Sequence, residues 1–189
     1  MSLSWKSRFG KIPGAVMLAV LLALTLVLAT PGVPAFAEDG TPPPPTGERL
    51  DQQLELCLDR LGEWRGVQAN NLERAAQAVE RIEQALDKAK SLGIDVSEGE
   101  ALLAQMVSLL AAADDHHEQA GAILNAHQGY DGDGSVVDRE QAGDTCRTGR
   151  DALANARDSL LDMRQLAGEL SQLAREWRQS HRQAPVPES

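Results

Sequence analysis

Apolar and small side chains recur at alternating steps of three and four residues between residues 146 and 181. This row reads Cys146, Gly149, Leu153, Ala156, Leu160, Met163, Ala167, Leu170, Ala174, Trp177 and His181. The period keeps one stripe on one side of an α-helix. A second row, spaced by seven residues, widens the stripe: Ala152, Ser159, Leu166 and Leu173. So wide an apolar stripe predicts a helix that packs against two neighbouring helices. The helix needs these neighbours because its apolar stripe must be covered for the helix to be stable in water.

Two earlier segments, about 48–92 and 98–127, repeat this spacing. The first carries Leu50, Leu54, Cys57, Leu61, Trp64, Gln68, Leu72, Ala75, Val79, Ile82, Leu86 and Ala89. The second carries Leu102, Met106, Leu109, Ala113, His116, Ala120, Ile123 and His127. Two consecutive steps of four meet at Gln68, among glycines and asparagines, which predicts a bend there or a break into two helices.

Local signals place the helix ends. Gly93 is expected to end the first helix in the left-handed conformation, with Ile94 folding back on the last turn. Ser97 and Glu100 have the pattern of a capping box that opens the second helix, and Asp138 is placed to cap the third. No proline occurs from residue 46 to residue 184, and a proline within a helix would break it.

The predicted fold is all-α, an elongated antiparallel three-helix bundle of the coiled-coil type. It covers residues 48–183, with helices at about 48–92, 98–127 and 138–183, followed by a disordered tail at 184–189. Short connections make neighbouring helices antiparallel. The first and third helices therefore run parallel to each other.

The first 37 residues have the pattern of a secretory signal peptide. A basic stretch precedes an apolar run at 15–29, and Ala-Phe-Ala ending at Ala37 fits the rule for cleavage after that residue. We expect export to the periplasm, the cell surface or the medium. The alternative is an uncleaved anchor helix, for which the run is short. Residues 38–47 include Pro42–Pro45 and predict an extended linker, with a docking peptide as the alternative.

The chain is acidic, with 28 acidic and 18 basic residues and a formal net charge of −10. This charge repels phosphate backbones and anionic membranes, so we expect no nucleic acid partner and no membrane contact except through an uncleaved signal segment. The sequence contains no phosphate-binding loop, dinucleotide fingerprint or nucleophile–base motif. These features argue against an enzyme and favour a protein partner or self-association.

Cys57 and Cys146 lie on the inward rows of the first and third helices. Cys57 is ~52 Å from the first turn and the second helix returns ~45 Å, from the rise per residue of a helix. An up-down-up bundle therefore places both cysteines at a similar height. Since paired cysteines usually form a bridge in an oxidising compartment, we predict a Cys57–Cys146 disulfide. Two free buried thiols are the alternative.

The loop 129–140 resembles the calcium-binding loop of EF-hand proteins. Asp131 and Asp133 stand at its third and fifth positions and Glu140 at its twelfth, where carboxylate ligands belong. Gly129 departs from the pattern, because it removes the leading carboxylate. The resemblance implies at most a weak Ca²⁺ site. The alternative is a turn in which Asp-Gly pairs supply left-handed glycines and the acids cap the next helix.

His116, His117 and His127 form a second candidate metal site, for a transition metal, together with the neighbouring acids Asp114, Asp115 and Glu118. Zinc sites need three or four convergent ligands, and no His-x-x-x-His pair is present. The competing interpretation is polar residues of the helix seam that set the register and meet partners across the bundle.

Several stretches resemble a set of exported bacterial helical proteins with no assigned activity. They are Asn71-Leu72-Glu73-Arg74-Ala75, Ile123-Leu124-Asn125-Ala126-His127, Tyr130-Asp131 and Asp138-Arg139-Glu140-Gln141-Ala142. The resemblance implies fold and location and transfers no catalytic residue. We therefore expect an exported, non-enzymatic interaction or structural module of the cell envelope. The alternative is a divalent-cation binding or sensing protein that uses the 129–140 loop or the histidines.

Overall fold

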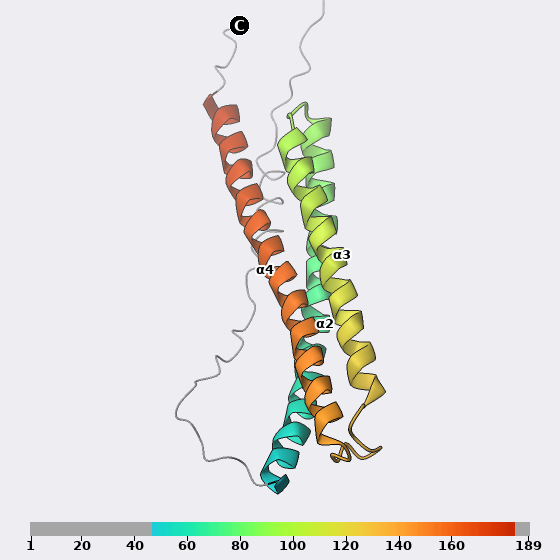
Figure 1. Ribbon diagram of the computed structural model, residues 1–189. Helices are drawn as coiled ribbons and strands as arrows, with labels where there is room; N and C mark the ends of the chain where they lie inside the picture. The colour runs from blue at the N-terminus through green and yellow to red at the C-terminus, as the bar shows by residue number, and fades with distance from the viewer. Residues whose placement is uncertain (1–46, 184–189) are drawn as a thin grey trace, which may run out of the picture.

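Three long helices form the part of the chain that the structure, a computed structural model, describes, namely residues 47–183 (Figure 1). They are α2 (Gly47–Ser91), α3 (Ser97–Ala126) and α4 (Arg139–Gln183). Each end falls within one residue of its predicted position. The predicted signal peptide at 1–37, almost all of the linker at 38–47 and the tail at 184–189 lie outside the described residues.

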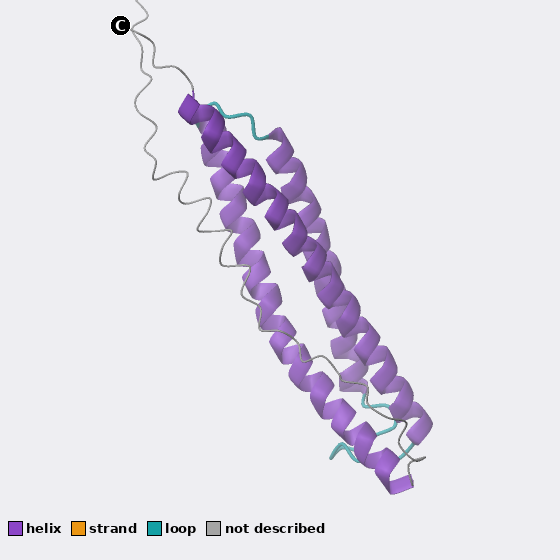
Figure 2. Cartoon of the chain, turned by 90° about the vertical axis from the view of Figure 1, so that its left-hand side faces the viewer, coloured by secondary structure: helices purple, strands orange, loops and turns teal. Residues whose placement is uncertain are grey.

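The helices run up, down and up, so α2 and α4 are parallel and α3 is antiparallel to both (Figure 1). A second view shows the same elongated rod, with loops at its two ends (Figure 2). We call these the hairpin end, where residues 92–96 join α2 to α3, and the disulfide end, where residues 127–138 join α3 to α4. The predicted three-helix bundle is confirmed.

The stutter at Gln68 does not divide α2, which continues as one helix from Gly47 to Ser91. The alternative of two shorter helices is therefore wrong. The physical reason is that Gln68 is buried and keeps the inward row continuous between Leu61 and Leu72. A helix in a bundle takes most of its stability from this buried stripe rather than from local propensity.

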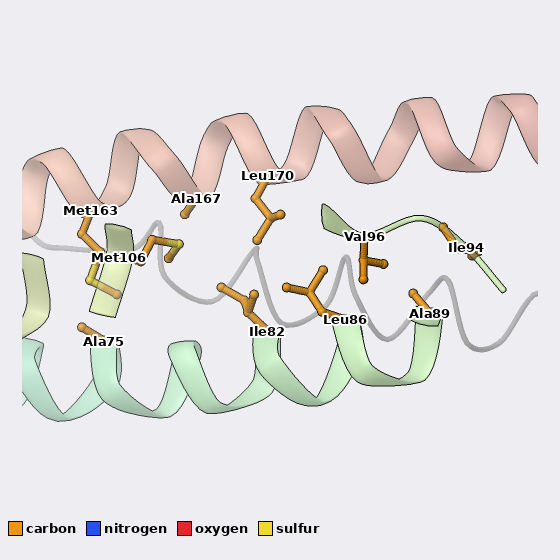
Figure 3. Packing of buried hydrophobic residues seen from close by; sticks show 10 residues of the cluster. All are labelled: Ala75, Ile82, Leu86, Ala89, Ile94, Val96, Met106, Met163, Ala167 and Leu170. Atoms are coloured by element: carbon orange, nitrogen blue, oxygen red, sulfur yellow. The ribbon is translucent and has the colours of Figure 1, made fainter. Parts of the chain in front are cut away.

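Aliphatic side chains from all three helices fill the interior toward the hairpin end (Figure 3). In this cluster Ile82 of α2 and Leu170 of α4 point toward each other, and both are almost completely buried. Its buried members are Ala75, Ile82, Leu86, Ala89, Ile94, Val96, Met106, Met163, Ala167 and Leu170. A smaller cluster of Leu61, Ala120, Leu124, Ala152 and Leu153 lies toward the disulfide end.

The α2–α3 connection begins as predicted. Gly93 has φ +80°, and its N–H donates to the Lys90 carbonyl at 2.9 Å. The N–H of Ile94 donates to the Ala89 carbonyl at 3.2 Å, and the Ile94 side chain is buried. These two bonds form a Schellman motif, so the left-handed glycine and the returning isoleucine are confirmed.

The predicted capping box of α3 is wrong. Val96 occupies the N-cap position and makes no side-chain cap bond. Instead, the carboxylate of Asp95 accepts the N–H of Ser97 at 3.1 Å. Glu100 pairs with Lys90 of α2 at 2.6 Å, because α2 ends beside the first turn of α3. An ion pair across the hairpin thus replaces the reciprocal bond of a capping box.

Candidate functional site

Cys57 of α2 and Cys146 of α4 form a disulfide, as predicted from their heights in the bundle. Their Cα atoms are 6.2 Å apart and the two residues are separated by 89 positions. Cys146 is buried and Cys57 half-buried. The bridge joins the two parallel helices near the end where α2 has no chain connection to either of the other helices.

Tyr130 is buried beside the disulfide and joins the connecting loop to both parallel helices. Its hydroxyl donates to the carbonyl of Leu54 at 2.9 Å and lies 3.3 Å from the sulfur of Cys146. Burial, and to a smaller extent the nearby carboxylate of Glu55, raises the pKa of the phenol. The neutral hydroxyl therefore remains a hydrogen-bond donor well into the alkaline range. The sequence offered no motif for this contact beyond the single tyrosine in the loop.

The backbone of the α3–α4 connection folds tightly around Gly129. His127 ends α3 with φ +49°, and Gly129 follows with φ +86°. The Gly129 carbonyl accepts the N–H groups of Val137 and Asp138 at 2.9 and 3.1 Å. A Cβ at position 129 would collide with the backbone of Ala142, so both the conformation and the space require glycine.

The carboxylates of Asp131 and Asp138 accept hydrogen bonds from backbone N–H groups of the loop and of the first turn of α4. Asp131 Oδ1 accepts the N–H groups of Asp133 and Ser135 at 3.0 and 2.9 Å. Asp138 Oδ1 accepts those of Glu140 and Gln141 at 3.0 and 3.1 Å, which confirms Asp138 as the cap of α4. In the turn interpretation, the acids of the loop hold its backbone and cap the next helix, and these bonds do both.

Neither candidate metal site is assembled. Among residues 47–183, no group of three or more His, Cys, Asp or Glu side chains is arranged to hold a metal ion. His127 is exposed at the end of α3, whereas His116 and His117 are half-buried farther along that helix. The carboxylates of Asp131, Asp133 and Glu140 are likewise not gathered into such a group. Divalent-cation binding stays a prediction without support from the described geometry.

His117 belongs instead to a polar layer that crosses the interior. Its Nδ1 lies 3.2 Å from Oε1 of Gln68, whose Nε2 donates to the carbonyl of Leu153 at 2.9 Å. The layer therefore links α3, α2 and α4. Since the Gln68 amide turns its oxygen toward His117, Nδ1 must carry the proton of the neutral ring. The prediction that seam histidines meet polar partners across the bundle holds for His117, with an amide as the partner.

Arg65 lies next to this layer, and its guanidinium covers Gly121 of α3. A Cβ at position 121 would stand only 2.6 to 2.9 Å from three guanidinium atoms, so glycine makes room for the arginine. The Nε atom of Arg65 is buried and has no hydrogen-bond partner. Burial first, and then the charge of Arg65, lowers the pKa of His117, while Asp114 and Glu118 act in the opposite direction.

No family model, curated protein or solved structure matches the chain. The resemblance to exported bacterial helical proteins therefore gains no support from these comparisons. What stands is a three-helix protein with a disulfide between its parallel helices. Within residues 47–183, no helix is both long and apolar enough to cross a membrane.

Proposed function

We propose that the protein is an exported, non-enzymatic interaction or structural module of the cell envelope. The main support is that the side chains capable of chemistry, such as the cysteines, Tyr130 and His117, form bonds that hold the helices together. The two cysteines bridge α2 to α4, Tyr130 bonds to Leu54, and Gln68 connects His117 to α4. The bridged cysteines offer no thiolate, which is the nucleophilic form of cysteine.

Export is supported by the disulfide and by the pattern of the first 37 residues. Disulfides persist mainly in oxidising compartments, and this bridge joins residues 89 positions apart. An N-terminus at Glu38 in protein recovered from the envelope or medium would agree with the proposed cleavage after Ala37. Recovery of the uncleaved chain from the cytoplasm, with reduced cysteines, would contradict export.

Interaction through the helix surfaces is tested by photo-cross-linking in the cells that make the protein. A photoreactive residue replaces Leu161 of α4, which is 50% exposed, or Val107 of α3, which is 48% exposed. We expect a discrete adduct with a protein from at least one position. The same residue in place of buried Leu153 is the control and yields none. Absence of an adduct from every exposed position, in protein with an intact disulfide, would contradict an interaction role.

A further inference from the structure

Charged side chains are sorted by face along the described helices. Helix α3 carries acids and no lysine or arginine between Ser97 and Ala126. Its acids are Glu98, Glu100, Asp114, Asp115 and Glu118, all exposed. The described basic residues therefore lie mainly on the other two helices, although the chain as a whole has a net charge of −10.

On α4, the basic residues repeat every seven positions and so share a side of the helix. One row holds Arg150, Arg157, Arg164 and Arg178, and the row beside it holds Arg147, Ala154, Leu161, Gly168 and Arg175. Most acids of α4 occupy other rows, for example Asp151 with Asp158, and Asp162 with Glu169, whereas Glu140 shares the row of Arg147. Arg157 also pairs with Asp158 at 2.8 Å, where the two sides meet.

Contacts with the other two helices fix the direction of these rows. Leu170 and Trp177 of α4 lie against Gly99 of α3, so that flank of α4 faces α3. The row of Arg150 and Arg157 lies on the opposite flank, beside Leu153, whose carbonyl binds Gln68 of α2. These arginines therefore border α2 rather than α3.

Helix α2 shows the matching arrangement. Arg65 covers Gly121 of α3, so the opposite flank of α2 borders α4. That flank carries Arg49, Leu56, Arg60, Glu63, Val67, Arg74, Arg81 and Lys88, all exposed. Glu63 is the single acid in this set. Leu56 and Val67 are each 52% exposed, so aliphatic surface lies among the charges.

We call the exposed surface formed by these flanks of α2 and α4 the basic face. Basic residues have partners both on this face and away from it. On the face, Arg147 pairs with Asp144 and Arg157 with Asp158, each at 2.8 Å. Away from it, Arg65 covers Gly121, Lys90 pairs with Glu100, and Arg139 donates to Asp51 at 2.7 and 2.9 Å. Like charges side by side destabilise a helix pair, so a surface of this kind is expected to meet an acidic counterpart.

The acidic counterpart lies on the other side of the same molecule. In a three-helix bundle, the outer side of α3 is opposite the face shared by α2 and α4. Between its acids, that side carries small exposed residues: Ala101, Ala104, Ser108, Ala111 and Ala122. Small residues let another helix approach closely, and the acids complement arginine.

We propose that the basic face binds the outer side of α3 in a second copy of the chain. The inference rests on the proposed interaction role and supplies its surface and its partner. Such a contact is heterologous, because different patches of the two copies meet, and each added copy leaves one basic face and one α3 free. The protein therefore associates head to tail into open-ended assemblies rather than closed dimers.

The net charge of each copy and the salt concentration determine the conditions under which the copies associate. Copies with a net charge of the same sign repel at long range, but a Debye length of about 10 Å at 0.1 M salt screens that repulsion more than it screens close contacts. We expect concentration-dependent association near 0.1 M salt and its loss near 1 M salt. Analytical ultracentrifugation of the protein purified from cells expressing the full chain measures both.

Three variants locate the two surfaces. Arg60→Gln with Arg150→Gln neutralises the basic face and weakens association about tenfold, the size expected for two charge pairs. Asp115→Asn with Glu118→Gln on α3 has a similar effect. Gln52→Glu with Gln179→Glu changes net charge as much as the arginine pair does, on the acidic rows of α2 and α4 outside the basic face, and leaves association within about twofold.

A mixture of the two neutralised variants gives the sharpest result. One retains a working α3 surface and the other a working basic face, so together they form a one-to-one pair that does not grow. A protein that stays monomeric at every concentration near 0.1 M salt would overturn the inference. So would binding of the monomer to phosphatidylglycerol vesicles through Arg60 and Arg150, which would assign the face to a membrane. A monomer that still cross-links to another envelope protein would leave the proposed function intact.

Discussion

The two ends of the rod are held together by different means. At the hairpin end, the interior is aliphatic, and a short Schellman turn joins α2 to α3. At the disulfide end, a covalent bridge, a buried tyrosine and a polar layer accompany a smaller apolar cluster. The stabilisation from apolar burial grows with the area removed from water, whereas polar and covalent contacts stabilise the fold only when the right two groups meet.

This difference follows from the connections of the chain. A short link keeps α2 and α3 together at the hairpin end without further help. At the opposite end, α2 begins far in sequence from the α3–α4 connection, and nothing but side chains holds it there. The bonds from Tyr130 to Leu54, from Val136 to Glu55 and from Arg139 to Asp51 all join the loop side to the first turns of α2. Local bonds therefore define one end and long-range bonds the other.

Removal of the disulfide is expected to have the largest effect. Cys57→Ala with Cys146→Ala opens the loop closed by residues 89 positions apart, which costs about 4.6 kcal/mol of unfolding free energy in the chain-entropy description. Urea denaturation measures the loss, and hydrogen exchange locates it. Exchange should increase in the first turns of α2 and α4 and remain slow around Ile82. Equal increases at both ends would contradict a separate role for the bridge.

Truncation of Leu170 tests the hairpin end. This side chain is 1% exposed within the aliphatic cluster, so Leu170→Ala leaves a cavity and costs about 3 kcal/mol. Leu161→Ala on the same helix is the control, because Leu161 is 50% exposed and its loss should change stability by less than about 0.5 kcal/mol. Similar losses for the two variants would show that the cluster is not tightly packed.

Gln68→Ala tests the polar layer that separates the two clusters. The change removes the bond to the Leu153 carbonyl and leaves Nδ1 of His117 without its partner, at a cost of about 2 kcal/mol. Asn70→Ala is the matched control, since the exposed Asn70 side chain bonds only to Gly66 of its own helix. A loss no greater for Gln68 than for Asn70 would mean that the buried amide adds little.

The sequence contains the information for the local end more plainly than for the long-range end. The apolar period predicts α2, α3 and α4 to within a residue, and Gly93 with Ile94 predicts the turn, because these signals act between near neighbours. The disulfide could be predicted because helical rise converts sequence position into height. Val96 rather than Ser97 is the N-cap of α3, and the carboxylate of Asp95 binds the Ser97 N–H because the turn geometry brings it to the helix end, a detail that residue preferences alone do not decide.

The polar layer and the Tyr130 contact have no comparable local signal. Gln68 and His117 are 49 positions apart, and their pairing depends on the relative rotation of two helices. Tyr130 reaches the Leu54 carbonyl across 76 positions. A glutamine at a seam position and a glycine at position 121 are visible in the sequence, but only packing shows that one meets a histidine and the other accommodates Arg65.

Lowering the pH through the titration of His117 should reduce the free energy of unfolding by a small amount. Burial and Arg65 lower the pKa of His117 from its usual value of 6.5, so the folded protein binds fewer protons than the unfolded chain just below that pH. Stability is therefore unaffected by His117 above about pH 7.5, falls as the pH drops through about 6.5, and levels off below the lowered folded pKa. Thermal melts between about pH 7.5 and 5.5 measure this slope, above the range where carboxylates dominate.

His117→Gln isolates the contribution of this ring, since an amide can still donate to Gln68 and does not titrate. We expect the variant to show a flatter dependence of the melting temperature on pH over that interval. His127→Gln is the control, because His127 is exposed at the end of α3 and its replacement should leave the slope in place. An unchanged slope in His117→Gln would show that the protonation of this ring is not linked to folding. The measurable contribution of the polar layer to stability would then come from Gln68 alone.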